Sequence, residues 1–150
     1  MAMTIKFNDT AKTTLAYIRA FEEPTYFDNA NRRQLRFECD PSVISLDALN
    51  TILSDPANLK SLELHNDGEA MDGNPASDPS TSIYDNYTIK IECAMKPVPV
   101  GNDAETNAEI RADRICFTLG RKTPTEIEQE VQAAQIAELQ AAMAALIAQK

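Results

Sequence analysis

Apolar and polar residues alternate along several segments of the chain, and this period of two predicts half-buried β-strands. In "RRQLRFEC" one face carries Leu35, Phe37 and Cys39, and the residues between them are polar. The alternation is longest in "YDNYTIKIECAMK", and "DRICFTLGRK" repeats it near the end of the chain. We expect these last two segments to pair as antiparallel strands joined by a long, mobile loop.

A segment near the N-terminus, "TTLAYIRAF", is apolar on both of its faces. One face would carry Leu15, Tyr17 and Phe21, and the other Ala16, Ile18 and Ala20. Strands of this kind are typical of the centre of a sheet or of a strand covered on both sides. We therefore expect a single buried strand here.

The period changes in "SVISLDALNTILSDP", where apolar residues follow the three-and-four spacing of an amphipathic helix. Ser45 is the expected N-cap, and Pro56 marks the end of the helix. A strand follows in "LKSLELHND", with Leu62 and Leu64 facing inward. The strand, helix and strand form either a crossover unit or a mainly antiparallel sheet with a helix on one face.

The last helix begins with a specific signal. Thr123 is the N-cap, Pro124 occupies the first helical position and Glu126 completes a capping box. The sequence therefore predicts an α+β protein: a mainly antiparallel β-sheet domain with one short internal helix at residues 1–122, and a long C-terminal helix at residues 123–150.

The apolar residues of this C-terminal helix lie on two different faces. Ile127 and Val131 share one side, where the first turns could pack on the strands. The other side repeats in a heptad rhythm, which is typical of helix–helix contacts. The residues expected to form an oligomer contact are Ile136, Leu139, Met143 and Leu146. We expect a homo-oligomer, with a trimer favoured; in the alternative, the helix folds back over "LAYIRAF" and the chain is a monomer.

Charge argues against several classes of partner. The chain of 150 residues has 14 Lys and Arg against 23 Asp and Glu, for a net charge of −9, which repels nucleic acid and anionic lipid. The segment "MAMTIKFNDTAKTT" lacks the apolar core of a signal peptide, and no uninterrupted apolar run has the length of a membrane span. We expect synthesis in the cytoplasm and neither a nucleic-acid nor a membrane partner.

Candidate chemistry is sparse. His65 is the single histidine, so a His-rich metal site is excluded. Cys39, Cys93 and Cys116 form no CxxC pair, and we interpret the first two as small core residues and the third as facing the other way. The acids of the loop at 66–82 do not have the spacing of the twelve-residue calcium loop. We expect no enzyme, no cofactor and no metal site.

Three segments taken together suggest a family. A β-rich start "MTIKFNDT", the strand "YDNYTIKIECAMKPVPV" and "RADRICFTLGRKTPTEIEQE" running into an Ala- and Gln-rich helix resemble small uncharacterised proteins. These are encoded in the tail and lysis regions of bacteriophages and prophages of Gram-positive gut bacteria. The resemblance implies a virion or assembly component associated with the tail, with other phage structural proteins as partners, and it assigns no site residue.

Two functions remain open from the sequence. The first is a phage structural or assembly protein of the tail or baseplate that self-associates through its C-terminal helix. The second is a monomeric binding module that contacts a host or phage partner through the acidic loops at 66–82 and 97–109.

Overall fold

The computed structural model describes residues 3–68 and 78–149, which form two antiparallel sheets of four strands and two α-helices. The first sheet has the order β2-β1-β5-β6, with β1 (Met3–Lys6), β2 (Thr14–Ala16), β5 (Ser61–Asn66) and β6 (Ser80–Asp85). The second has the order β3-β4-β8-β7, with β3 (Arg19–Phe27), β4 (Ala30–Cys39), β7 (Ile89–Asn102) and β8 (Glu109–Gly120). The helices are α1 (Leu46–Leu53), a 3₁₀ turn at Pro56–Leu59, and α2 (Pro124–Ala148). The predicted α+β class is confirmed.

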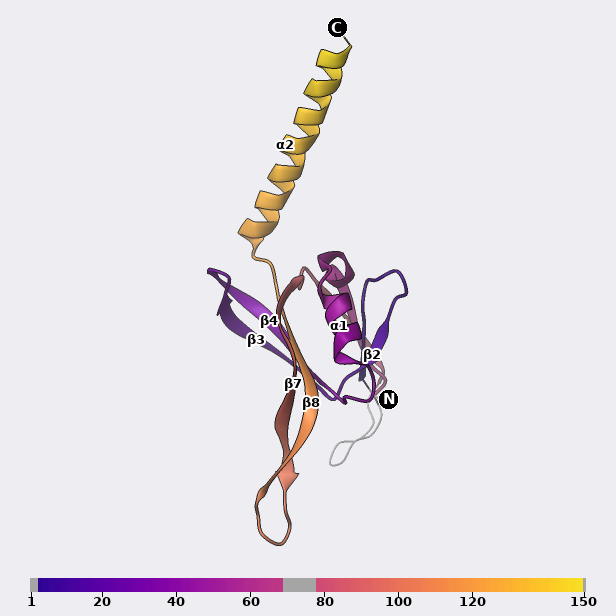
Figure 1. Ribbon diagram of the computed structural model, residues 1–150, viewed down its shortest axis with the longest axis vertical. Helices are drawn as coiled ribbons and strands as arrows, with labels where there is room; N and C mark the ends of the chain where they lie inside the picture. The colour runs from indigo at the N-terminus through magenta and orange to yellow at the C-terminus, as the bar shows by residue number, and fades with distance from the viewer. Residues whose placement is uncertain (1–2, 69–77, 150) are drawn as a thin grey trace.

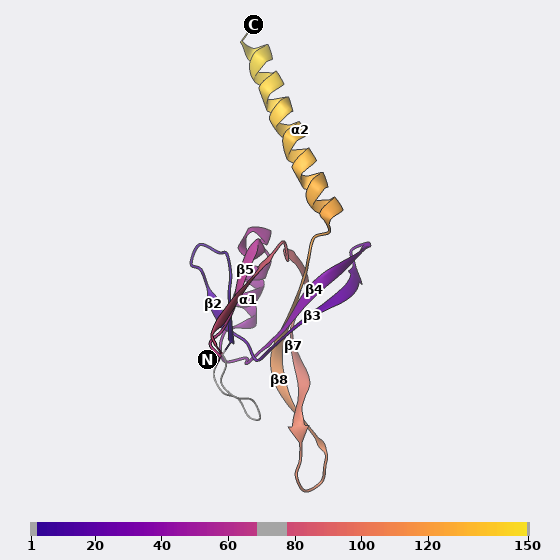
Figure 2. The same ribbon diagram turned by 180° about the vertical axis from the view of Figure 1, so that it is seen from behind.

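The core is formed by residues from both sheets and from α1 (Figures 1 and 2). The rings of Phe37 and Phe117 stack in the second sheet, with centroids 4.8 Å apart. Phe7 follows β1 and places its ring 6.3 Å from that of Phe117. Leu49 and Leu53 of α1 are buried in the same cluster. Each fully buried aromatic of this kind stabilises a fold by about 3–5 kcal/mol relative to alanine.

The predicted inward faces of β4, β5 and β8 are confirmed, but the single inward phase expected along β7 is broken by a register shift between Lys90 and Glu92, and Met95 is 44% exposed. The buried in-phase residues are Leu35, Phe37 and Cys39 of β4, Leu62 and Leu64 of β5, and Ile115, Phe117 and Leu119 of β8. Cys93 packs against this core, and Cys116 lies half-buried on the opposite face of its strand. The three thiols are free, as expected for small core and surface residues.

The expectation of one strand in "TTLAYIRAF" is wrong, because the chain changes sheet within it. Tyr17 donates its backbone N–H to Met3 of the first sheet, and Ile18 donates to Glu38 of the second, at N to O distances of 3.2 and 2.7 Å. The inward phase shifts at this crossing, so Tyr17 is buried but Phe21 is 39% exposed. Both resulting strands, β2 and β3, lie at sheet edges and not at a centre.

The predicted loop at 97–109 is also wrong. Strand β7 continues through Pro97 and Pro99 to Asn102, and β8 begins at Glu109, so the connection is limited to residues 103–108. The prolines are tolerated because β7 is an edge strand, where a missing N–H need not break a ladder. Strand β4 reaches only Ile115, so the hairpin beyond it is a two-stranded arm, drawn at the bottom of Figure 1.

The loop expected at 66–82 is shorter than predicted at both ends, because β5 ends at Asn66 and β6 begins at Ser80. Residues 69–77 lie outside the described residues, so the calcium spacing considered there has no structural account. Helix α1 begins at Leu46 with the predicted cap, since the Ser45 hydroxyl accepts the backbone N–H of Ala48 at 3.1 Å. It connects β4 of one sheet with β5 of the other, so no crossover unit forms within a sheet.

Candidate interaction surface

Helix α2 leaves the sheets just after β8 and extends away from them (Figures 1 and 2). Its predicted capping box is confirmed. The Thr123 hydroxyl accepts the backbone N–H of Glu126 at 3.2 Å, and the Glu126 carboxylate accepts the backbone N–H of Thr123 at 2.8 Å. These two bonds satisfy donors that a helix start otherwise leaves without partners.

A buried arginine of β4 fixes the first turn of α2 to the second sheet. Arg32 donates from Nη1 and Nη2 to the two carboxylate oxygens of Glu126, at 2.7 and 3.2 Å. It also donates to the backbone carbonyls of Phe27 and Arg121, at 2.9 and 3.0 Å. The Arg32 side chain is completely buried, whereas that of Glu126 is 31% exposed. A planar guanidinium suits this bidentate contact, because its donors are held in a fixed fork.

The sequence predicts the role of Glu126 in the helix cap but gives no sign of its ion pair with Arg32. The two residues are 94 positions apart, and no local pattern connects them. The Arg32 hydrogen bonds, followed by the backbone N–H of Thr123, lower the pKa of Glu126 to about 2. Glu126 therefore remains ionised, and the base of α2 remains bonded to Arg32, at any ordinary pH.

Further contacts hold the connection between β8 and α2. Arg121 donates its backbone N–H to Arg33 at 2.8 Å, and Lys122 donates to Asn86 at 2.9 Å. The Lys122 side chain forms an ion pair with Glu130 in the second turn of the helix. The base of α2 is therefore bonded to β4 and to the residue after β6. These bonds favour a fixed orientation of α2 relative to the sheets.

The sequence-predicted oligomer residues lie together on one exposed face of α2, which we call the helix stripe. Its members Ile136, Leu139, Met143 and Leu146 are 55–64% exposed. None of the described residues of α2 is buried, and of the two residues expected to meet the strands, Ile127 is half-buried and Val131 is exposed. The arrangement in which the helix covers "LAYIRAF" differs from the structure, where α2 extends away (Figure 2).

The positions beside the helix stripe carry no charge. With Ile136 and Met143 at heptad position a and Leu139 and Leu146 at d, the flanking e and g positions are Ala133, Gln135, Gln140, Ala142, Ile147 and Gln149. Glu138 falls at position c, away from the stripe. Because charges at e and g normally decide which helices pair, their absence removes repulsion between identical helices.

Helix α2 is also long and apolar enough to cross a membrane, judged by length and composition. Its most apolar 18-residue window has a mean hydropathy of 1.3, and none of that window is buried. The expectation from the sequence rested on uninterrupted apolar runs, which Gln135, Glu138 and Gln140 break. The absence of a membrane partner therefore stays a prediction.

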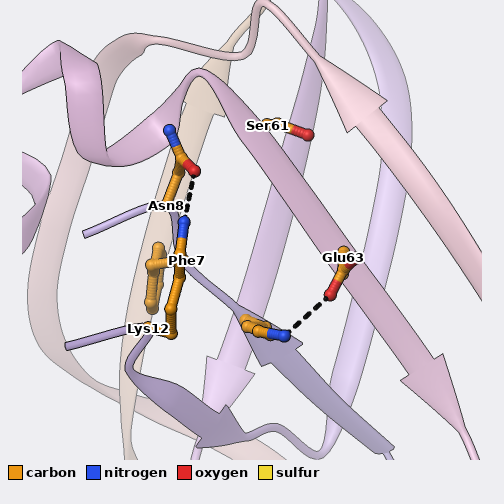
Figure 3. A pocket seen from close by; sticks show the side chains of 6 residues that line it. Phe7, Asn8, Lys12, Ser61 and Glu63 are labelled. Atoms are coloured by element: carbon orange, nitrogen blue, oxygen red, sulfur yellow. Dashed lines mark hydrogen bonds and ion pairs between the residues drawn. The ribbon is translucent and has the colours of Figure 1, made fainter. Parts of the chain in front are cut away.

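Small hollows of about 180–250 Å³ lie among the described residues. One hollow of about 230 Å³ lies beside Phe7 and Ser61, with Lys6 and Lys12 at its rim (Figure 3). The Lys12 amine donates to Asn8 at 2.8 Å, and Lys6 pairs with Glu63 at 3.3 Å. Ligand pockets usually enclose about 300–1,000 Å³ with groups free to bind, so this hollow is a poor ligand site.

The histidine, the acidic residues and the cysteines do not form a catalytic or metal site among the described residues. His65 of β5 is exposed, and its Nδ1 lies 2.9 Å from the hydroxyl of Thr81 on the neighbouring strand β6. Within residues 3–68 and 78–149, no group of three or more His, Cys, Asp or Glu residues could hold a metal ion. Burial raises the pKa of Cys39 to about 12, and the pKa of Cys116 is also raised by burial, which disfavours reactive thiolates.

Comparison with known proteins gives no relative on which to rest an assignment. The chain matches no protein-family model, no curated protein sequence and no solved structure.

Proposed function

We propose that this protein is a structural assembly protein that self-associates through α2. The observation that carries the proposal is the helix stripe, whose four apolar side chains are 55–64% exposed on a helix fixed at its base. Exposed apolar residues at heptad spacing lose the cost of hydration when a second helix covers them. A helix without such a partner would leave this face in water along half of its length.

A second copy of the chain fits the stripe better than a different helix does. In a parallel pair, the g position of one helix faces the e position of its neighbour one heptad further on. This places Gln135 opposite Gln140 of the second copy, where the amides can bond to each other, and Ala142 opposite Ile147. No like charges meet along this contact.

The copy number stays a prediction. The sequence led us to favour a trimer, although isoleucine at a with leucine at d, as in Ile136 and Leu139, is typical of parallel dimers. Two heptads also provide little area, so we expect the sheets to contribute to the assembled interface.

A membrane role for α2 is the main competitor. Glu138 lies near the middle of the apolar window, where an ionised side chain costs about 2.5–3.5 kcal/mol in a lipid bilayer. Gln135 and Gln140 also lie beside the stripe, whereas a lone span is apolar all round. Both features favour a helix partner over lipid.

The setting we propose is a phage tail or baseplate, with other phage structural proteins as further partners and the virion as the location. This part rests on the resemblance of the segments around "IKIECAMKPV" and "RICFTLGRKTPTE" to tail-region proteins. The fold supports this setting only indirectly. A sheet domain with a projecting apolar helix is suited to assembly, and its described residues form no catalytic site.

A binding module remains the second candidate function, and the β7–β8 arm favours it. The arm extends beyond the rest of the second sheet and exposes the apolar side chains of Val100 and Ile110. An exposed arm offers contact area for another protein. Under this candidate the chain would be a monomer, and arm substitutions would weaken the contact while α2 substitutions would not.

The test is the solution mass of the full chain, by light scattering, beside two double variants. Leu139→Asp with Leu146→Asp places two charges in the stripe, and we expect it to abolish α2-mediated association while the sheets stay folded. Ala134→Asp with Ala141→Asp is the matched control, since it adds the same charges at the same spacing at positions f, away from the stripe. The full chain is preferred to a version ending at Lys122, which would leave Arg32 buried without its carboxylate.

Three outcomes separate the candidates. A multimer that the stripe variant alone dissociates supports self-association through α2. A monomeric wild-type chain that binds neutral lipid vesicles supports the membrane alternative. A monomer that does not bind vesicles favours the binding module and overturns the assembly proposal.

A further inference from the structure

The four edge strands of the two sheets differ in how well they are protected against pairing with another chain. An exposed edge presents unpaired N–H and C=O groups, and proteins block such edges with short strands, prolines or charges. Strand β2 has only three residues. Strand β3 contains Pro24 and β7 contains Pro97 and Pro99, and both also carry charged residues. These three edges are therefore poor templates.

Strand β6 is the least protected of the four edges. From Ser80 to Tyr84 it contains neither proline nor a charged residue, and it is six residues long with Asp85 at its end. Its serine, threonine, isoleucine and tyrosine are compatible with a strand, and Ile83 is 62% exposed on its surface. Among the four edges, β6 alone is both long enough and unblocked.

The outer side of β6 has no backbone partner among the described residues. Strand β5 pairs with β6 along its whole length, from Ser61 opposite Asp85 to Asn66 opposite Ser80. The backbone hydrogen bonds that link other parts of the described chain do not involve residues 80–85. Because strand groups point alternately to the two sides, about half of the N–H and C=O groups of β6 face outward.

We propose that β6 pairs in antiparallel fashion with β6 of a second copy, joining two first sheets into one continuous sheet. A two-fold axis at Ile83 places this side chain opposite Ile83 of the other copy, and each covers an apolar group that is otherwise exposed. The same register places Thr81 opposite Asp85 of the second copy. No like charges lie directly opposite each other, although the chain as a whole carries −9.

The sequence of β6 favours a second copy of the chain as the partner of this edge. An antiparallel two-fold contact requires a segment that complements its own reverse, and the uncharged stretch centred on an apolar residue meets this requirement. The contact is independent of α2, because β6 and the helix stripe are separate surfaces.

The experiment uses the full chain with Leu139→Asp and Leu146→Asp, so that α2 no longer contributes. We expect this protein to form a dimer whose population rises with concentration, and we expect the amides of residues 80–85 to exchange more slowly in the dimer. Adding Ile83→Lys places like charges opposite each other and should weaken dimerisation at least about tenfold. The matched control is Ile110→Lys, an exposed isoleucine of the β7–β8 arm, which should leave the dimer unchanged.

Several results would overturn the inference. These are a monomer at all concentrations in the α2 variant, equal dimerisation with Ile83→Lys and Ile110→Lys, or concentration-dependent protection that excludes residues 80–85. Circular dichroism verifies that each variant is folded, and Ile83→Lys in the wild-type background provides a second measurement if the α2 variant is not. Because α2 and β6 are changed separately, failure of this contact and failure of the α2 contact are distinguishable.

Discussion

Arg32 is the residue on which the position of the C-terminal helix depends. Its guanidinium is buried, and burying a charge is costly unless the charge is paired and hydrogen-bonded. Glu126 supplies the opposite charge, and two backbone carbonyls accept most of the remaining donors. The pairing also makes Glu126 serve twice, as part of the helix cap and as the anchor of the helix to β4.

We expect Glu126→Gln to lower the free energy of unfolding by about 1–3 kcal/mol at neutral pH, because the buried Arg32 loses its carboxylate. The pKa of Glu126 is about 2 in the folded chain against an ordinary 4.5. A lowered folded pKa contributes stability that is fully present above the unfolded value and is lost as pH falls toward the folded value.

The difference between wild type and Glu126→Gln, measured by urea unfolding, should therefore be constant above about pH 5 and shrink between about pH 4.5 and pH 2. Glu128→Gln is the control, since Glu128 is exposed in the same turn. Equal behaviour of the two variants across this range would contradict the role given to the ion pair.

Helix α2 shows at the scale of an element how local and long-range effects divide. Its start is specified by adjacent residues, because Thr123 and Glu126 exchange hydrogen bonds within one turn. From Ala133 onward, an alanine-rich sequence favours the helix. Its direction is decided elsewhere, by Arg32 and by the backbone bonds of Arg121 and Lys122.

We expect Thr123→Ala to destabilise the first turn of α2 by about 1 kcal/mol, since a backbone N–H loses its acceptor. Exchange of the Glu126 and Ile127 amides should accelerate, while the core amides of β4 and β8 stay unchanged. Thr125→Ala is a suitable control, because its hydroxyl does not cap the helix. Slower or unchanged exchange at Glu126 and Ile127 would mean that Arg32 and Glu126 hold the turn without the cap.

At the scale of the whole molecule, three features extend from or border the sheets: α2, the β7–β8 arm and the open edge of β6. A monomer would leave the exposed apolar side chains of all three in water. Exposed apolar side chains therefore lie on α2, on the arm and on β6, outside the core. Assembly of several copies accounts for the helix stripe and β6 together.

Association of this kind makes stability depend on protein concentration, because folding and binding are linked. We expect the urea midpoint of the wild-type chain to rise with concentration. The rise should be smaller with Leu139→Asp and Leu146→Asp, smaller with Ile83→Lys, and absent when the changes are combined. A midpoint that is independent of concentration in the wild-type chain would argue against both contacts.

Sequence alone determined the features that depend on neighbouring residues. The inward faces of β4, β5 and β8, the Ser45 and Thr123 caps and the apolar stripe of α2 all follow from periodicity or from contacts within one turn. These signals are local because side chains return to the same face of a strand or helix within a few residues. When one face is buried, apolar residues therefore recur in the sequence with that period.

The tertiary structure alone decided the features that depend on distant residues. The change of sheet after Tyr17 needs a hydrogen bond to Met3 on one side and one from Ile18 to Glu38 on the other. The continuation of β7 through Pro97 is possible because β7 has a neighbour on one side only. The pairing of Arg32 with Glu126 joins residues 94 positions apart. Each of these depends on which strands meet, and that is decided by burial of the whole core, which no short window of sequence contains.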